Sequence, residues 1–199
     1  MPSYRTRSPS RHADTPSRIF SGSIFLIRSH SVATVSETPS PPPSLSPSAR
    51  KVQDALTAAG FPYQVTESAV STRTAAEAAK LVGCEVGQIA KSLVFKTEKT
   101  GRAILVIASG ANQVNEIRIG MYLKEAVVKA PAALVRQATG FAIGGVPPLG
   151  HATALPTFID QDLVKHAEIW AAAGTPNALF KLASADLVKM SGGLVVKVT

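Results

Sequence analysis

Residues 89–110, "IAKSLVFKTEKTGRAILVIASG", contain the feature that most restricts the fold: two β-rich runs on either side of a short polar turn. The connecting segment "TEKTG" is typical of a β-hairpin. The second run, "AILVIA", has no polar residue at alternate positions, which is typical of a central strand covered on both faces. The chain must therefore pack other elements against both sides of a sheet.

The other periodic segments mix helices and strands without strict β-α-β alternation. Gly60 and Gly83 mark the ends of the first two helices, and Thr74 with Glu77 forms a capping box at the start of the second. The periodicity predicts helices over 49–60, 71–83, 112–123, 131–140, 162–174 and 184–192, and strands over 61–66, 155–160, 177–183 and 193–199. This pattern predicts one α/β domain with a mixed β-sheet and flanking helices.

Residues 1–48 differ in composition from the rest, so we expect the folded domain to span 49–199. The leader is rich in Ser, Arg and Pro and ends in "SETPSPPPSLSPS". An Arg-rich, Ser-rich, acid-poor segment is typical of an organellar transit peptide, and its apolar patch is too short to span a membrane. One hypothesis is a mitochondrial presequence. The alternative is a disordered extension, or a segment that follows a rarely used upstream start codon, of a cytoplasmic protein.

The formal net charge of +8 favours an anionic partner, such as nucleic acid. About half of this excess lies in residues 1–50, which contain six arginines and two acidic residues. The folded part is therefore only mildly basic, and its charge alone does not define a partner.

Lys91 is the first candidate functional residue. Strand alternation places Lys91 on the same face as Leu93 and Phe95, and Ser92 and Val94 on the other face. A lysine on an apolar face needs a partner, so Lys91 is a candidate for holding an anion or orienting a substrate. The alternative is a side chain at the end of a strand that reaches water.

The second candidate is the segment 140–151, "GFAIGGVPPLGH", with four glycines and two prolines. Glycine allows close approach to the main chain, and proline fixes φ, so the segment predicts a rigid loop with directed amide groups. Such a loop can bind an anion or a carbonyl oxygen, although it can also be a tight connector between strands. His151 closes the loop and could position a substrate.

Several classes of protein are excluded or poorly supported. The single cysteine, Cys84, excludes an intramolecular disulfide and a Cys-rich zinc site, and we expect it to be a small buried residue. His166 has no ligand spaced for a shared metal, so we expect it at the surface. The chain contains no G-x-S-x-G, H-E-x-x-H, Walker A or G-x-G-x-x-G motif. We expect no cofactor, no metal and no membrane association.

Several segments together resemble the YbaK/EbsC family, relatives of the editing domain of bacterial prolyl-tRNA synthetases. The resemblance spans roughly residues 50–199 and is most specific at the lysine strand and the glycine loop. The segments are "IAKSLVFK", "ANQVNEIRIG", "GFAIGGVPPLGH", "TFID" and "SADLVKMSGG".

The resemblance implies hydrolysis of the ester that links a wrong amino acid to tRNA, often tRNA-Pro, by an enzyme acting in trans. It implies that Lys91 is the essential lysine and orients the 3′ acceptor end of the aminoacyl-tRNA, without a cofactor. Asp160 ends "TFID", where its default role is a helix N-cap. The residues predicted to bind substrate are Gly144, Gly145, Val146, Pro147, Pro148, Gly150, His151 and Asp160.

Two departures from the family pattern limit what can be transferred. Pro147 stands where many members have Ser, so the amino-acid pocket can differ, and "AGTPNAL" replaces a basic Gly-x-Arg-Gly segment. Two other functions stay open: a non-catalytic module that binds tRNA or a synthetase, and a small-molecule ester or amide hydrolase. The editing hypothesis requires Lys91 and the glycine loop to share one cleft, with the ammonium group on the same side of the sheet as the loop.

Overall fold

The structure is a computed structural model that describes residues 44–199. The helices are α1 (Pro47–Ala58), α2 (Ala75–Val82), α3 (Glu116–Leu123), α4 (Ala132–Thr139) and α5 (Ser184–Ser191), with two short 3-10 turns, η1 (Val86–Gln88) and η2 (Leu163–Lys165). The strands are β1 (Val65–Glu67), β2 (Ile89–Thr97), β3 (Ala103–Ser109), β4 (Val127–Lys129), β5 (Thr157–Asp160), β6 (Glu168–Ala172), β7 (Ala178–Ala183) and β8 (Leu194–Val196).

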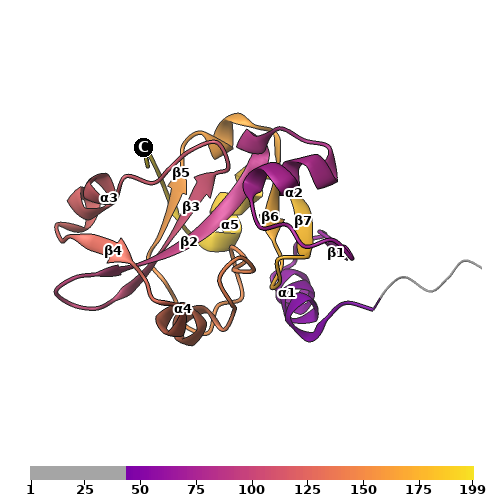
Figure 1. Cartoon of the computed structure of the whole chain (residues 1–199), viewed down its shortest axis with the longest axis horizontal. Coiled ribbons are helices and arrows are strands. Elements are labelled where there is room, and N and C mark those ends of the chain that lie inside the picture. Colours follow the sequence, from indigo (N-terminus) through magenta and orange to yellow (C-terminus); the bar gives the residue numbers. More distant parts are fainter. Residues whose placement is uncertain (1–43) are drawn as a thin grey trace, which may run out of the picture. The chain divides into compact units, whose positions relative to one another are not determined.

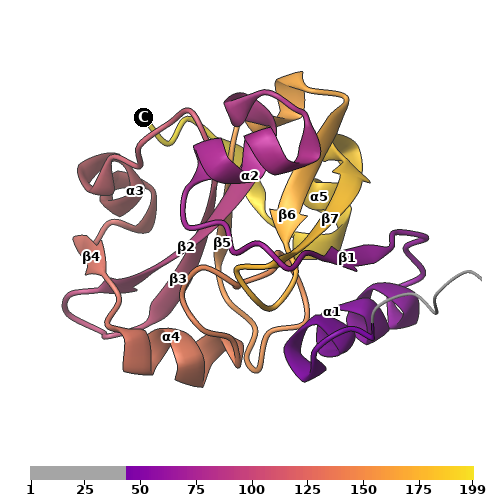
Figure 2. The same cartoon turned by 45° about the vertical axis from the view of Figure 1, so that its right-hand side comes forward.

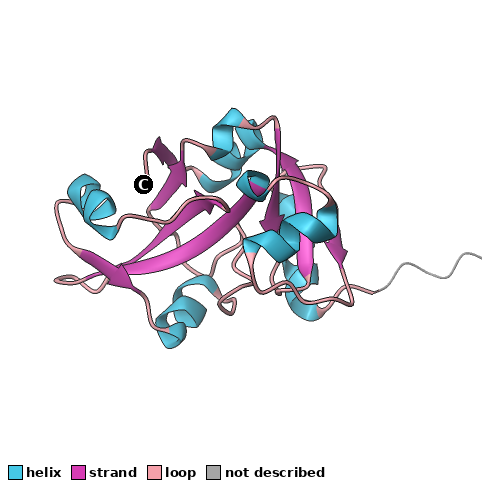
Figure 3. Cartoon of the chain, turned by 45° about the horizontal axis from the view of Figure 1, so that its top comes forward, coloured by secondary structure: helices cyan, strands magenta, loops and turns pink. Residues whose placement is uncertain are grey.

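The eight strands form one mixed sheet in the order β1-β7-β6-β2-β3-β5-β8, and β4 pairs with β2. Strands β2 and β3 form the predicted antiparallel hairpin, with Lys91 opposite Ala108. Residues 104–108 of β3 are fully buried, as expected for a central strand. Figures 1 and 3 show β2 as a long strand that crosses the middle of the sheet.

Different helices cover the two faces of the sheet. One face carries Val94, Leu105 and Ile107 and packs against α1, α4 and α5 through a single large apolar cluster. The opposite face carries Phe95 and Val106 and packs against α3, while a smaller cluster packs α2 over the start of β2. Figure 1 accordingly shows α2 in front of the sheet and α5 behind it, and Figure 2 shows α1 and α4 together at its lower edge. The mixed sheet with flanking helices confirms the predicted fold class.

One edge of β2 changes partner along its length. Strand β6 pairs with β2 at Ile89 and Ala90, whereas β4 pairs with it only from Phe95 to Thr97. Among the described residues, no strand pairs with this edge of β2 between Ala90 and Phe95. The sheet therefore has a gap beside Lys91.

The predicted helix over 162–174 is wrong. Only the short turn η2 forms there, and residues 168–172 form strand β6, which pairs with β7 and β2. In β6, Ile169 and Ala171 are buried while Trp170 and Ala172 are half-buried, a period of two that the alanine-rich composition concealed. Strand pairing overrides helix propensity here. The three-residue strand β4 was not predicted.

Local signals at the helix ends were mostly predicted correctly. The capping box of Thr74 and Glu77 is present, and Gly83 ends α2 in the left-handed conformation. Helix α1 begins at Pro47, with Ser46 as its N-cap, two residues before the predicted start of the domain. The predicted leader lies outside the described residues up to position 43.

Candidate active site

The gap beside β2 opens into a cavity of about 380 Å³. Its wall is formed by residues 89–95 of β2, the start of α2, the end of β4, helix α4 and parts of two loops. Most of the wall is apolar, including Val94, Val135 and Val146. The volume and lining are those of a small-molecule binding site.

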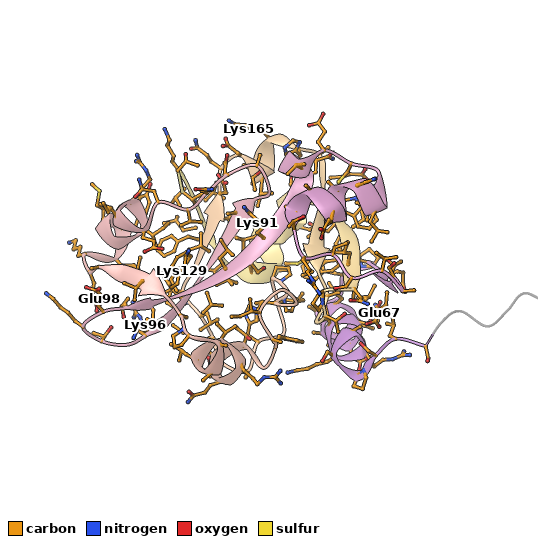
Figure 4. The ribbon with its side chains drawn as sticks, in the orientation of Figure 1. Glu67, Lys91, Lys96, Glu98, Lys129 and Lys165 are labelled. Carbon is orange, nitrogen blue, oxygen red and sulfur yellow. The ribbon has the colours of Figure 1, made fainter. Side chains whose placement is uncertain are left out.

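Lys91 lies in the wall of this cavity, near the start of β2 (Figure 4). Its side chain is half-buried on the α2/α3 face of the sheet, and its ammonium group donates a hydrogen bond to the carbonyl of Asn112 at 2.7 Å. Burial lowers the pKa of the Lys91 ammonium, and the negative charge of Asp160 opposes this shift. Lys91 thus contributes to the cavity wall, while its ammonium group is bonded to a carbonyl that lies outside that wall.

The glycine loop reaches the same cavity from the opposite face of the sheet. Gly144 and Val146 line the cavity, and Val146 also packs in the cluster beneath α1 and α4. Gly144 has φ of 89°, a conformation that a residue with a side chain rarely adopts. Lys91 and the loop therefore line one cavity, but they do so from opposite faces of the sheet, whereas the sequence-based hypothesis places the ammonium group and the loop on the same side.

Gly145 fastens the loop to a neighbouring turn. Its N–H donates to Ala142, its carbonyl accepts from the N–H of Gly174, and a Cβ at this position would lie 2.6 Å from the Gly174 carbonyl. The N–H of Gly145 is therefore occupied. The N–H groups of Gly144 and Val146 have no hydrogen-bond acceptor among the described residues.

His151 holds the loop in shape from within. Its Nε2 lies 2.7 Å from the carbonyl of Pro147, so this nitrogen donates the hydrogen bond. Burial lowers the pKa of the imidazole, the bond to Pro147 opposes this, and the charge of Lys51 adds to the lowering. His151 is therefore neutral at pH 7 and belongs to the frame of the loop.

The other predicted loop residues do not line the cavity. Pro147 and Pro148 are buried and Gly150 is exposed. Of the nine predicted site residues, the structure brings Lys91, Gly144 and Val146 together at the cavity. Gly145, Pro147, Pro148, Gly150 and His151 support this arrangement from outside.

Asp160 does not cap a helix and does not line the cavity. It is 1% exposed at the end of β5, where its carboxylate accepts hydrogen bonds from Ser109 N–H, Asn112 Nδ2 and Asp162 N–H. Each oxygen already has a partner. The predicted N-cap role fails because only the short 3-10 turn η2 follows this strand, and its N-cap position is Asp162.

Sequence reasoning missed three groups in the cavity wall. Arg73 precedes α2 and Lys129 ends β4, so the cavity carries three cations with Lys91 and no acidic residue. Ser92 is also in the wall, and its hydroxyl is buried without a hydrogen-bond partner among the described residues. The strand alternation could have indicated Ser92, but only the tertiary fold brings Arg73 and Lys129 here. Thr175 and Pro176, from the divergent "AGTPNAL" segment, complete the wall.

Other candidate centres are not supported by geometry. Cys84 is half-buried, and burial followed by the charge of Glu85 raises the pKa of its thiol, so it is not activated as a nucleophile. Within residues 44–199, no three His, Cys, Asp or Glu side chains converge to hold a metal ion. The same residues include no helix with the length and apolar character needed to cross a bilayer. His166 is half-buried, so part of its side chain lies at the surface.

The sequence and fold were compared with known proteins. The aminoacyl-tRNA editing domain family matches residues 69–190. Among curated proteins, the "uncharacterized protein YwhH" of Bacillus subtilis is 31% identical over 64% of this chain and 80% of its own length. The "putative Cys-tRNA(Pro)/Cys-tRNA(Cys) deacylase EbsC" of Enterococcus faecalis is 28% identical over 69% of this chain and 85% of its own length.

Two solved structures are also similar to this chain in sequence and fold. A protein described as "a putative trans-editing enzyme for prolyl tRNA synthetase" is 49% identical, with a TM-score of 0.75 over 78% of this chain and 99% of that one. The "hypothetical protein APE2540" is 28% identical, with a TM-score of 0.69 over 74% of this chain and 98% of that one.

The fold and the cavity thus define a domain of the aminoacyl-tRNA editing class. The chain belongs to the aminoacyl-tRNA editing domain family, in its YbaK/EbsC branch. Since editing of an aminoacyl-tRNA removes the attached amino acid, the chain is an aminoacyl-tRNA deacylase.

Proposed function

We propose that the protein acts in trans on mischarged aminoacyl-tRNA of the tRNA-Pro class and hydrolyses its ester in the cavity beside β2. The observation that carries this proposal is the joint placement of Lys91 and the glycine loop on one cavity. The names of EbsC and of the solved trans-editing relative support the choice of tRNA.

The charges of the cavity suit the end of a nucleic acid. Arg73, Lys91 and Lys129 supply three positive charges, and no acidic side chain lies in the wall. Such a cavity attracts the phosphates of a tRNA 3′ end and would bind an anionic backbone in a salt-dependent way. In this arrangement Lys91 holds the acceptor end, and the other two cations contact phosphates at the cavity mouth.

The chemistry needs little beyond positioning. A water oxygen bonds to the ester carbonyl carbon, the bond between that carbon and the ribose oxygen breaks, and the water's proton passes to the ribose oxygen. The free N–H groups of Gly144 and Val146 are suited to hold the negative oxygen that forms in between. The wall residues Val94 and Val135 would contact a small uncharged amino-acid side chain.

The test is a deacylation panel with purified protein. Ala-, Cys- and Ser-tRNA-Pro are compared with correctly charged Pro-tRNA-Pro, and Lys91→Ala is the inactive variant. We expect rapid release from at least one mischarged tRNA and loss of release in Lys91→Ala. Release from none of them, with tRNA binding retained in both proteins, would identify a non-catalytic binding module instead.

A salt titration tests the roles of the cavity cations separately. Arg73→Ala and Lys129→Ala should each weaken tRNA binding and reduce the slope of log affinity against log salt by about 1, since each removes one phosphate contact. Lys96→Ala is the matched control, because Lys96 lies on the same strand as Lys91 but outside the cavity. An unchanged slope in both variants would place the tRNA elsewhere.

The proposal extends to the leader. The composition of residues 1–48 supports a mitochondrial presequence. Fusion of this segment to a fluorescent protein should direct the protein to mitochondria, and diffuse cytosolic fluorescence would contradict targeting.

A further inference from the structure

The ammonium group of Lys91 is held by a main-chain carbonyl. It donates to the oxygen of Asn112 at 2.7 Å, and no carboxylate among the described residues forms an ion pair with it. The position of that carbonyl therefore determines where the ammonium group of Lys91 rests. Asn112 lies in the loop between β3 and α3, outside the cavity wall.

Two carboxylates fix the side chain of Asn112. Its Nδ2 donates to Asp160 Oδ2 at 2.8 Å and to Asp162 Oδ2 at 2.7 Å. Both protons of the amide are thus occupied, and the residue cannot rotate without losing a bond to an anion. The loop is held where its carbonyl faces Lys91.

Asp160 is the rigid base of this arrangement. It is almost fully buried, and its Oδ2 also accepts from the N–H of Ser109 at 3.1 Å, while Oδ1 accepts from the N–H of Asp162 at 3.1 Å. Asp160 therefore joins the end of β5 to the end of β3. Asp162 is more exposed and is paired with Lys165 at 2.6 Å.

We propose that Asp160 is a positioning residue of the deacylation site, acting through Asn112 on the ammonium group of Lys91. The inference rests on the proposed function, because it assumes that Lys91 holds the substrate. It gives Asp160 a role different from direct substrate binding. The other charged groups around this cluster are Asp162, Lys165, Lys197, Arg73 and Lys129.

The arrangement has a consequence for protonation. Burial favours the neutral amine of Lys91, and the charge of Asp160 opposes this effect. Removal of that charge lowers the pKa of Lys91 further, so the lysine loses its proton at a lower pH. As the pH is raised, an activity that needs the ammonium form therefore begins to decline at a lower pH than in the wild type.

The test compares Asp160→Asn with Asp186→Asn in the full chain. Asp186 serves as a control because its carboxylate also accepts hydrogen bonds at both oxygens, from Lys189 and Tyr63, but lies outside the cavity and away from Lys91 and Asn112. The titration of the Lys91 side chain is followed by NMR, with Lys91→Ala used to assign its signal. We expect the Lys91 pKa to fall in Asp160→Asn and to stay unchanged in Asp186→Asn.

Single-turnover deacylation gives the second readout. We expect Asp160→Asn to be at least tenfold slower than wild type at pH 8, with its alkaline decline moved to lower pH, and Asn112→Ala to be slowed as well. In the Lys91→Ala background, Asp160→Asn should have no further effect on the residual rate. If Asp160→Asn does not fold, Asn112→Ala replaces it in both measurements. This variant keeps the main-chain carbonyl but removes the side-chain hydrogen bonds to Asp160 and Asp162.

Two results would overturn the inference: an unchanged Lys91 titration in Asp160→Asn, or an equal loss of rate with and without Lys91. The second pattern is that of a residue that only supports the fold. Failure of the wild-type protein to deacylate any tRNA would contradict the proposed function. The NMR titration does not depend on catalysis, so it would still test whether Asp160 acts on the ammonium group of Lys91.

Discussion

Strand β2 at the gap and the glycine loop contribute to the same cavity in opposite ways. Strand β2 contributes side chains, with Lys91 directed to one face of the sheet and Ser92 and Val94 to the other. The loop contributes backbone: the N–H groups of Gly144 and Val146 have no acceptor among the described residues, and Gly145 and His151 hold the loop in place through their own hydrogen bonds.

The difference shows how two faces of a sheet can serve one site. A continuous sheet would separate Lys91 from the loop, since each packs on its own side. The change of partner from β6 to β4 removes that barrier over a few residues. A side chain from one face and main-chain donors from the other can then contact a single ligand.

The largest expected effect is at Lys91. Lys91→Ala should slow single-turnover deacylation roughly 100-fold to 1000-fold, the loss seen when one charge-stabilising donor is removed from an enzyme. Thermal unfolding should be nearly unchanged, since the substitution removes a half-buried charge. Lys96→Ala should keep wild-type activity. A small loss in Lys91→Ala would mean that the loop alone carries the reaction.

The next effect is at Gly145, where the loop has no room for a side chain. Gly145→Ala would bring a Cβ to 2.6 Å from the Gly174 backbone, so it should lower the free energy of unfolding by about 1–3 kcal/mol and displace the loop. Deacylation should fall at least tenfold. Gly60→Ala is the control: it introduces backbone strain at φ of 77° but meets no atom within 4 Å. Its activity should be unchanged, and equal losses in both variants would show that stability alone is measured.

A smaller effect concerns pH and His151. Because the folded protein lowers the pKa of His151 below 6.5, the unfolded chain binds more protons once the pH falls below that value. The loop's contribution to stability is therefore present above pH 6.5 and declines below it, by at most about 1.4 kcal/mol per pH unit. Urea unfolding at several pH values should show a shallower decline in His151→Gln. Identical slopes would indicate that the pKa of His151 is the same in the folded and unfolded protein.

The smallest effect is at Ser92. Its hydroxyl is buried without a partner among the described residues, so Ser92→Ala should raise the free energy of unfolding by up to about 1 kcal/mol. Chemical denaturation measures this directly. A clear loss of stability would show that the hydroxyl is hydrogen-bonded in the folded protein, and Thr72→Ala provides a comparison, since Thr72 lines the same cavity with a bonded hydroxyl.

Local patterns predicted much of the fold. The hairpin of β2 and β3, the capping box at Thr74 and the helix end at Gly83 depend on residues close in sequence. Strand β6 was missed because its pairing with β2 and β7 joins segments far apart in the chain, and alanine-rich "WAAA" favours a helix when considered alone.

Less of the site was predictable, because it also depends on contacts between segments that are far apart in the chain. Lys91 and the glycine loop were found from residue type and resemblance. The hydrogen bond between Asn112 and Asp160 spans 48 positions, and only the tertiary fold brings Arg73 and Lys129 to the wall of one cavity. No sequence spacing could indicate these pairs.

The interrupted edge of β2 also affects inhibitor design. A strand edge without a neighbouring strand can pair with a flat amide-containing compound as with an added strand, and here the carbonyl of Val94 already accepts from the N–H of Ala130, so the part available to such a compound lies toward Ser92 and Lys91. Such a compound could extend along the edge and place an anionic group near Lys91, combining main-chain recognition with charge in one small molecule.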